Sequence, residues 1–220
     1  MKKLVLFDID HTLMEVYDTH KKVFATAFKK VYGLDVDYTK WKYHGYTDLE
    51  IIHDILDKNN VSKDKIPEII STMIEDFKKE DLSESVLLPG VLEILERLKS
   101  HDEIIVGIVT GNVEEIAFTK LRHFNIHEFF LAGGYGHSST IRAELIDLAK
   151  DKARKFGEIK ETIVIGDTFK DIQAAKEAKV KIIAVATGSK SYEELKEKNP
   201  DYVFHNLEET DEIVEVILNE

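Results

Sequence analysis

Two acidic residues follow the first apolar segment of the chain. Asp8 and Asp10 come directly after the apolar residues 4–7 and stand two positions apart. In extended backbone such residues face the same side, so two carboxylates would meet at a strand end. Like charges this close are unfavourable unless a cation, a shared proton or a hydrogen-bond donor offsets them. For an isolated Asp-x-Asp pair, a polar strand end that leads into a turn is the simpler interpretation.

A second polar group follows the apolar residues 104–109. Thr110 offers a hydroxyl, Gly111 lets the backbone approach a ligand, and Asn112 precedes a segment that is helical by pattern and starts with glutamates. Amides at a helix start point outward and bind anions. The segment therefore fits an anion site, although a plain helix N-cap by Asn112 explains it equally well on its own.

Asp167 and Asp171 follow a third apolar segment, residues 162–165. Asp171 fits a first-turn acid that the helix dipole favours, whereas Asp167 stands at a strand end as Asp8 does. We expect the three segments to bring their polar ends to one edge of one parallel sheet. Because the acids offer only oxygen donors, without His or Cys, they suit Mg²⁺.

Short apolar segments alternate with helical patterns through most of the chain. Continuous apolar runs predict strands that are covered on both faces, as in a parallel sheet between helix layers. From about residue 88 onward strands and helices alternate, so we expect an α/β fold with a doubly wound parallel sheet. The predicted strands are residues 4–7, 104–109, 162–165 and 182–186, with weaker candidates at 129–131 and 202–204.

Residues from about 15 to 87 interrupt this alternation with a block of helical patterns. Apolar residues 24, 27, 28 and 31 share one helix face. Thr47 is expected to open a second helix with a capping box, and Ser62 to open a third. We expect an all-helical cap at 15–87, inserted into an α/β core of residues 1–14 and 88–220. It would cover the sheet edge where such folds bind ligands.

Composition excludes several classes of protein. Acidic residues outnumber basic ones by 42 to 30, which gives a formal charge of −12. A surface this negative repels nucleic acid and anionic lipid, so neither is an expected partner. The absence of Cys excludes disulfides, a thiolate nucleophile and Cys-bound metal centres. The apolar runs are too short for a signal peptide or a membrane span, so we expect a cytoplasmic protein. The sequence leaves the oligomeric state open between a monomer and a homodimer.

Taken together, these segments resemble the haloacid dehalogenase (HAD) superfamily. Its four motifs occur in the same order, at residues 8–12, at Thr110, at a cation further on, and at residues 166–171. The resemblance covers the whole chain and includes the helical cap of the phosphoglycolate phosphatase-like and β-phosphoglucomutase-like members. It implies the Rossmannoid core of that superfamily.

The resemblance also implies a role for each motif residue. Asp8 would be the nucleophile that becomes an aspartyl-phosphate, and Asp10 would protonate the leaving oxygen and then activate water. Mg²⁺ would lie between Asp8, the backbone carbonyl of Asp10 and Asp167, with Asp171 acting through water. The phosphoryl oxygens would be held by Thr110 and the amides that follow it, at Gly111 and Asn112.

The third motif of the superfamily is a single cation, usually Lys, ahead of the fourth motif. Arg142 occupies this place and offers a forked donor to phosphate. The competing Lys150 and Lys152 lie further along the same predicted helix, and Lys160 lies in a polar connection. A second departure is His11, where Gly is frequent in the superfamily, and we interpret it as a solvated turn residue.

An aromatic-rich stretch of the predicted cap runs from Trp41 to residue 48. Most of its aromatic side chains are expected to pack within the cap. In capped relatives the matching stretch lies near the mouth of the active site. Candidates for substrate contact are therefore Gly45, Thr47 and Asp48, followed by His20 and Lys22.

The sequence thus predicts a Mg²⁺-dependent phosphatase that hydrolyses a small phosphorylated metabolite. A dehalogenase and a phosphonate hydrolase are disfavoured, because neither reaction gives Asp10 a leaving-group oxygen to protonate. A sugar-phosphate mutase uses the same two aspartates and stays open as an alternative. A non-catalytic binding module is the alternative from another class, although such a module would be expected to lack one of the motif residues.

Overall fold

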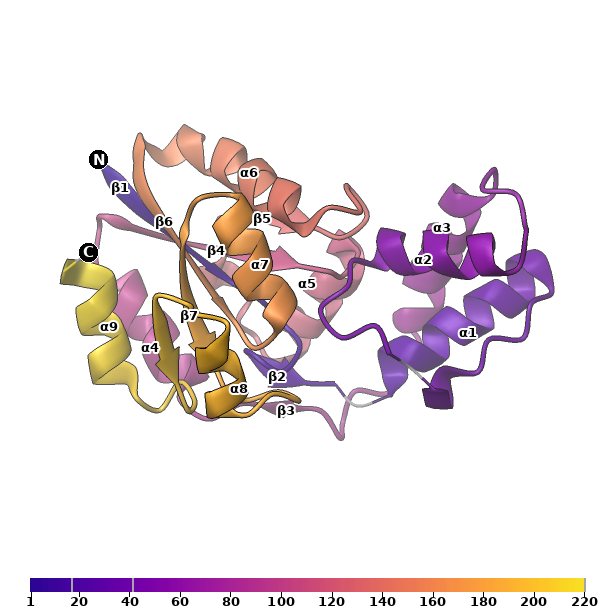
Figure 1. Ribbon diagram of the computed structural model, residues 1–220, viewed down its shortest axis with the longest axis horizontal. Helices are drawn as coiled ribbons and strands as arrows, with labels where there is room; N and C mark the ends of the chain where they lie inside the picture. The colour runs from indigo at the N-terminus through magenta and orange to yellow at the C-terminus, as the bar shows by residue number, and fades with distance from the viewer. Residues whose placement is uncertain (17, 41, 220) are drawn as a thin grey trace.

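The computed structural model describes residues 1–16, 18–40 and 42–219. Its centre is a sheet of six parallel strands in the order β5-β4-β1-β6-β7-β8 (Figure 1). These strands are β1 (Lys2–Phe7), β4 (Ile104–Thr110), β5 (Ala132–Tyr135), β6 (Ile159–Gly166), β7 (Lys181–Val185) and β8 (Tyr202–Phe204). The predicted doubly wound α/β fold is confirmed.

Helices cover both faces of the sheet, which explains why the strands are apolar throughout. Val5 and Phe7 of β1 belong to one apolar cluster, and Leu4 and Leu6 to the other. The first cluster includes α4 (Val91–Lys99), α5 (Glu114–His123) and α9 (Thr210–Asn219). The second includes α6 (Arg142–Ala153), α7 (Phe169–Glu177) and α8 (Tyr192–Glu197). Because alternate residues of a strand face opposite sides, one apolar strand supplies both cores.

The helical insertion follows β1 and lies beyond one end of the sheet (Figure 1). It holds α1 (Thr19–Tyr32), α2 (Asp48–Lys58) and α3 (Ile66–Phe77), with a 3₁₀ turn at Tyr38–Lys40. The chain leaves and re-enters the core through a two-stranded antiparallel ribbon, β2 (Met14–Glu15) with β3 (Val86–Leu87). Residues 24, 27, 28 and 31 are buried, as their spacing predicts.

Two local predictions about the insertion have different outcomes. Thr47 is the N-cap of α2, and its side chain accepts a hydrogen bond from the Glu50 amide at 3.1 Å. The Glu50 carboxylate does not complete the predicted capping box; it binds Lys170 of the core at 2.8 Å instead. The prediction for Ser62 is wrong, because α3 begins at Ile66, with Pro67 in its first turn. Proline lacks an amide hydrogen and is tolerated only in that first turn, which fixes the start of the helix.

The weaker strand prediction at residues 129–131 is also wrong. Phe129 ends a 3₁₀ turn, and the strand is the next segment, Ala132–Tyr135. This strand contains Gly133 and Gly134, and a side chain on Gly134 would meet the Leu145 carbonyl oxygen at 1.9 Å. The close approach of α6 to the sheet therefore requires a residue without a side chain. The other weak candidate, Tyr202–Phe204, is confirmed as β8.

No helix in the described ranges combines the length and the apolarity needed to cross a bilayer. Trp41, the first residue of the aromatic-rich stretch, lies outside the described residues.

Candidate active site

Three strand ends meet at one edge of the sheet, where the sequence places its acidic residues. Asp8 follows β1, Thr110 ends β4, and Asp167 follows β6. The strand register aligns these three strand ends, because Phe7 pairs with Ile108 of β4 on one side and with Ile165 of β6 on the other. The grouping predicted from strand ends is therefore what the topology produces.

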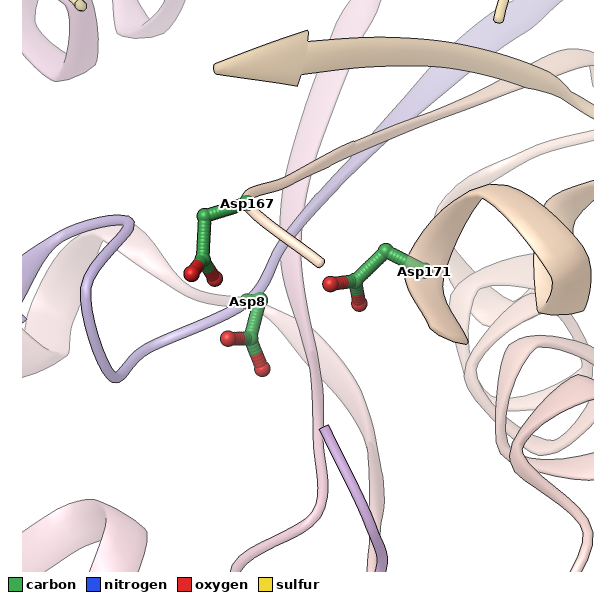
Figure 2. Close-up of side chains that lie close together, drawn as sticks. All are labelled: Asp8, Asp167 and Asp171. Carbon is green, nitrogen blue, oxygen red and sulfur yellow. The ribbon is translucent and has the colours of Figure 1, made fainter. Parts of the chain in front are cut away.

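Three carboxylates from these segments form a compact cluster. One oxygen from each of Asp8, Asp167 and Asp171 lies within 4.8 Å of the others, and all three residues are buried. Figure 2 shows the three side chains lying close together, from the end of β1, the end of β6 and the start of α7. Three buried acids at this separation repel one another unless a cation lies near them.

Burial, with the charges of Asp171 and Asp10 as smaller causes, raises the pKa of Asp8 to about 7 against the opposing charge of Arg142. Burial also raises the pKa of Asp167 well above its ordinary value, with the charges of Asp171 and Asp8 as additional causes. Thr12 donates a hydrogen bond to Asp167 at 3.3 Å. The cluster thus holds protons that a bound metal ion would have to displace.

Arg142 is the first residue of α6 and lies beside this cluster, buried at 8% exposure. One guanidinium nitrogen lies 2.7 Å from Asp8 and 2.5 Å from Asp171. The other terminal nitrogen donates to the Gly45 carbonyl of the insertion at 3.2 Å. Arg142 therefore links two of the acids to the insertion. Its place next to Asp8 is the one that the sequence assigned to the third motif.

Asp171 has a structural function besides its place in the cluster. It is the third residue of α7 and completes a capping box with Thr168. One of its oxygens accepts hydrogen bonds from the Thr168 amide at 3.0 Å and the Thr168 hydroxyl at 2.5 Å. The other oxygen faces Arg142. The start of α7 therefore holds the Asp171 carboxylate in place. Asp171 is a first-turn acid of the helix and also a member of the acidic cluster.

Asp10 is held by a different cation from Asp8. Its two carboxylate oxygens lie 2.7 and 2.8 Å from the Lys120 ammonium, and Asn112 donates to one of them at 2.7 Å. Burial acts to raise the pKa of Asp10, but the charges of Lys120 and His20 and these hydrogen bonds together lower it to about 2. At neutral pH Asp10 is therefore a carboxylate, the form that accepts a proton.

Lys120 is absent from the residues that the sequence singled out. A lysine inside a helix usually has a solvated ammonium group, and this one contacts a residue 110 positions away. A signal for it was nevertheless present. Lys120 stands four residues after Ile116 and three after Ala117, so it shares the buried face of α5. A charge on an apolar helix face needs a partner in the core.

Asn112 does not cap α5, whose N-cap is Val113. The Asn112 amide nitrogen also donates to Thr110 at 2.7 Å, and its oxygen accepts from Lys120 at 2.7 Å. The Asn112 side chain therefore connects the Thr110 hydroxyl with the Asp10 carboxylate. The Asn112 backbone amide also donates to the Thr110 hydroxyl, at 3.3 Å.

The loop before α2 packs closely on the core at Gly111. The Gly111 carbonyl accepts from the Asp48 amide at 2.7 Å, and the Asp48 carboxylate accepts from the Val113 amide at 2.8 Å. A side chain on Gly111 would meet the Tyr46 carbonyl oxygen at 2.2 Å. Glycine at this position lets the insertion lie directly against the proposed phosphate-binding segment.

The remaining candidates from the sequence take different positions. Gly45, Asp48 and His20 line the cavity, and His20 Nε2 lies 3.0 Å from an Asp48 oxygen. Thr47 is buried as the cap of α2, and the Lys22 ammonium pairs with Glu80 at the surface.

His11 also lines the cavity, with a left-handed backbone conformation at φ 60°. The left-handed backbone explains why Gly is frequent at this position in the superfamily.

These residues surround a cavity of about 130 Å³ between the sheet edge and the insertion. The core side of its lining includes Asp8, Asp10, Thr110, Gly111, Asn112, Arg142 and Asp167. The insertion side includes His20, Lys21, Tyr43, His44, Gly45, Tyr46 and Asp48. The space suits a compact molecule and is too small for a folded polymer chain.

The donor set of the cluster fits a hard divalent cation. It consists of carboxylate oxygens only, from buried residues with mutual repulsion that a cation would relieve. The side chains that could hold Mg²⁺ are Asp8, Asp167 and Asp171. The Asp10 side chain is bound to Lys120 instead, so Asp10 has only its backbone carbonyl to offer, as the resemblance implies.

Comparison with known proteins agrees with this fold. The model of the haloacid dehalogenase-like hydrolase family matches residues 5–185 of the chain. The match covers more than half of the sequence and spans the strand ends described above. The chain therefore belongs to the haloacid dehalogenase-like hydrolase family.

Curated relatives and solved structures are similar to the chain over most of its length. Pyrophosphatase PpaX of Halalkalibacterium halodurans is 26% identical over 218 residues, which cover 96% of each chain. Phosphoglycolate phosphatase of Agrobacterium fabrum is 29% identical over 126 residues, 56% of this chain and 53% of that protein. The crystal structure of a predicted phosphatase from Clostridium acetobutylicum has a TM-score of 0.74 at 22% identity, with full coverage of both chains.

Proposed function

We propose that this protein is a Mg²⁺-dependent phosphatase that hydrolyses a small phosphorylated metabolite through an aspartyl-phosphate intermediate. The observation that carries the proposal is the arrangement of two aspartates with two different cations. Asp8 lies beside Arg142 in the acidic cluster, and Asp10 lies nearby but is bound to Lys120. This arrangement supports attack on phosphorus by Asp8 and proton transfer by Asp10.

In the first half of the proposed reaction, a carboxylate oxygen of Asp8 attacks phosphorus. The bond between phosphorus and the leaving oxygen breaks, and that oxygen takes a proton from Asp10. Because Asp10 is a carboxylate in the free protein, it must first receive this proton, which the monoanion of a phosphate ester can supply on binding. Thr110, the amides after it and Arg142 hold the phosphoryl oxygens, whose charge must be stabilised in the transition state. Mg²⁺, when bound, would neutralise charge on the phosphoryl group and on Asp8.

In the second half, water attacks the phosphorus of the aspartyl-phosphate. Asp10, now a carboxylate, accepts the proton of that water. The bond between phosphorus and the Asp8 oxygen breaks, which releases phosphate and restores Asp8. Both halves require Asp10 close to the leaving or entering oxygen, and this agrees with its fixed position in the structure.

The insertion is proposed to act as a cap, with boundaries at 15–87 against a core of 1–14 and 88–220. Its support is the close packing of residues 45–48 on Gly111 and Arg142, which places cap side chains over the cavity. A cap that closes the cavity would keep bulk water out during phosphoryl transfer and restrict substrates to compact ones.

The cavity lining also includes two cationic side chains suited to an anionic substrate. They are Lys21 on the insertion side and Arg142 on the core side. The similar proteins named above are a pyrophosphatase and a phosphoglycolate phosphatase. We therefore place pyrophosphate and phosphoglycolate in the first substrate panel.

The proposal is tested by measuring phosphate release with p-nitrophenyl phosphate and a panel of phosphorylated metabolites, with Mg²⁺ and with EDTA. We expect turnover of p-nitrophenyl phosphate and of at least one metabolite, and loss of both on chelation. If neither compound class releases phosphate in the presence of Mg²⁺, Mn²⁺ or Co²⁺, the chain is a binding module. If a sugar phosphate is isomerised faster than phosphate is released, the mutase alternative replaces hydrolysis.

A further inference from the structure

Lys120 is the only buried lysine among the described residues, with no exposed surface at all. Burial of an ammonium group costs several kcal/mol unless hydrogen bonds and an opposite charge offset it. For packing alone, a leucine at this position on the apolar face of α5 would make the protein more stable than a lysine does. The presence of Lys120 therefore indicates a function other than packing in the core.

The surroundings of Lys120 use its full hydrogen-bonding capacity. The ammonium has three donors, and it faces three acceptors: both oxygens of Asp10, at 2.7 and 2.8 Å, and the Asn112 oxygen at 2.7 Å. The Phe77 ring of the insertion lies below it, at 5.7 Å from the ammonium to the ring centroid. These contacts leave the ammonium no donor for a substrate, so it acts on the site through Asp10 and Asn112.

The same contacts fix the direction of the Asp10 carboxylate. Lys120 binds both of its oxygens, and the Asn112 amide holds one of them from a second side. The Asn112 amide also reaches the Thr110 hydroxyl. A continuous chain of hydrogen bonds therefore joins Lys120, Asp10, Asn112 and Thr110. These hydrogen bonds fix the position of Asp10, the proposed proton-transfer residue, relative to Thr110 in the proposed phosphate-binding segment.

We propose that Lys120 is a positioning residue that, together with Asn112, holds the Asp10 carboxylate at the oxygen that leaves or enters phosphorus. This inference rests on the proposed function, because it assigns Lys120 to the same proton transfers. It differs from a purely structural function in its consequence. Loss of Lys120 should harm only those steps in which Asp10 moves a proton.

Substrates with different leaving groups distinguish a positioning function of Lys120 from a purely structural one. Proton transfer to the leaving oxygen matters greatly for an alkyl phosphate and little for p-nitrophenyl phosphate, because p-nitrophenolate is a stable anion. In single-turnover experiments with Lys120→Met, we expect alkyl alcohol release to slow by about 10²-fold or more, within the usual range for general acid catalysis. Release of p-nitrophenolate should slow by less than about tenfold. An equal loss with both substrates, or none, would overturn the proposal.

A double-mutant cycle tests whether Lys120 acts through Asp10. If it does, Lys120→Met should have almost no further effect on alkyl phosphate turnover in an Asp10→Asn background. Additive losses would show that Lys120 acts elsewhere. The matched control is Lys99→Met, an exposed lysine that also lies over an aromatic ring and should leave both rates unchanged.

Two measurements keep the outcome clear. If Lys120→Met does not fold by circular dichroism, Lys120→Gln retains a donor near Asp10, and the same ratio of the two release rates decides the matter. Failure of the wild-type protein to release phosphate from any substrate would refute the proposed function itself. An active wild-type protein with an unchanged leaving-group ratio in the Lys120 variants would refute only this inference.

Discussion

The two aspartates after β1 differ in the balance between burial and a neighbouring cation. Asp8 and Asp10 are two positions apart, yet Asp8 pairs with Arg142 and Asp10 with Lys120. At Asp8 burial outweighs the charge of Arg142 and raises the pKa to about 7, whereas at Asp10 the charges of Lys120 and His20 and the hydrogen bonds outweigh burial and lower the pKa to about 2. Opposite shifts in two neighbouring carboxyls are typical of a pair with different chemical functions.

The raised pKa of Asp8 predicts how Mg²⁺ affinity depends on pH. Below about pH 7 the metal-free site holds a proton on Asp8 that the cation must displace, and the raised pKa of Asp167 adds to this. Affinity should therefore rise between pH 5.5 and 7.5, by about tenfold per pH unit for each proton displaced. Titration calorimetry in buffers of different ionisation enthalpy measures this proton release directly. An affinity that is independent of pH over this range would contradict it.

The residues of the site were predictable from sequence to different degrees. Asp8, Asp10, Thr110 and Asp167 stand at the ends of apolar segments, so strand prediction alone brought them together. Arg142 could be assigned only through the resemblance to the superfamily. Of its two partners, Asp8 is 134 positions earlier in the chain and Asp171 is later. Lys120 needed the tertiary structure, since only the packing of α5 shows that its ammonium faces Asp10.

At the scale of elements, apolar runs identified the long buried strands but failed at the short strand β5. The strands β1, β4, β6 and β7 are buried on both faces, so continuous apolar runs identified them. The strand β5 escaped prediction because two of its four residues are glycines, of which Gly134 is required where α6 approaches the sheet. The preceding apolar residues form a turn that packs against the core and were mistaken for the strand.

Gly111 is the element-scale position where the insertion meets the core. A methyl group there would lie 2.2 Å from the Tyr46 carbonyl oxygen, so Gly111→Ala should push the loop before α2 away from the phosphate-binding segment. We expect kcat/KM to fall by about tenfold or more, since a small misplacement of a positioning segment is costly. Faster limited proteolysis of the insertion should accompany the loss.

The matched control for this variant is Gly33→Ala. Gly33 ends α1 with φ 69° and has no neighbour within 4 Å of an added methyl group. The change should cost about 1–2 kcal/mol of stability, because an alanine is strained in the left-handed region, and leave kcat/KM unchanged. Equal kinetic losses in both variants would show that Gly111 affects folding rather than cap placement.

At the scale of the whole molecule, the net charge of −12 is distributed unevenly. Four of the acids lie at one sheet edge, where Arg142 and Lys120 offset three of them directly. Many others pair with lysines at the surface, where such ion pairs contribute little to stability. A surface that repels polyanions therefore encloses a cavity whose cations and metal site suit one small anion.

The central claim is that Asp8 carries the phosphoryl group during turnover. It is tested most directly by mixing the Asp10→Asn variant with substrate labelled in its phosphoryl group, quenching in acid, and mapping the label by peptide mass spectrometry. We predict label on Asp8, released by hydroxylamine as expected for an acyl phosphate, and no label or turnover in a folded Asp8→Asn variant. Label on another residue, or an active Asp8→Asn variant, would contradict the account.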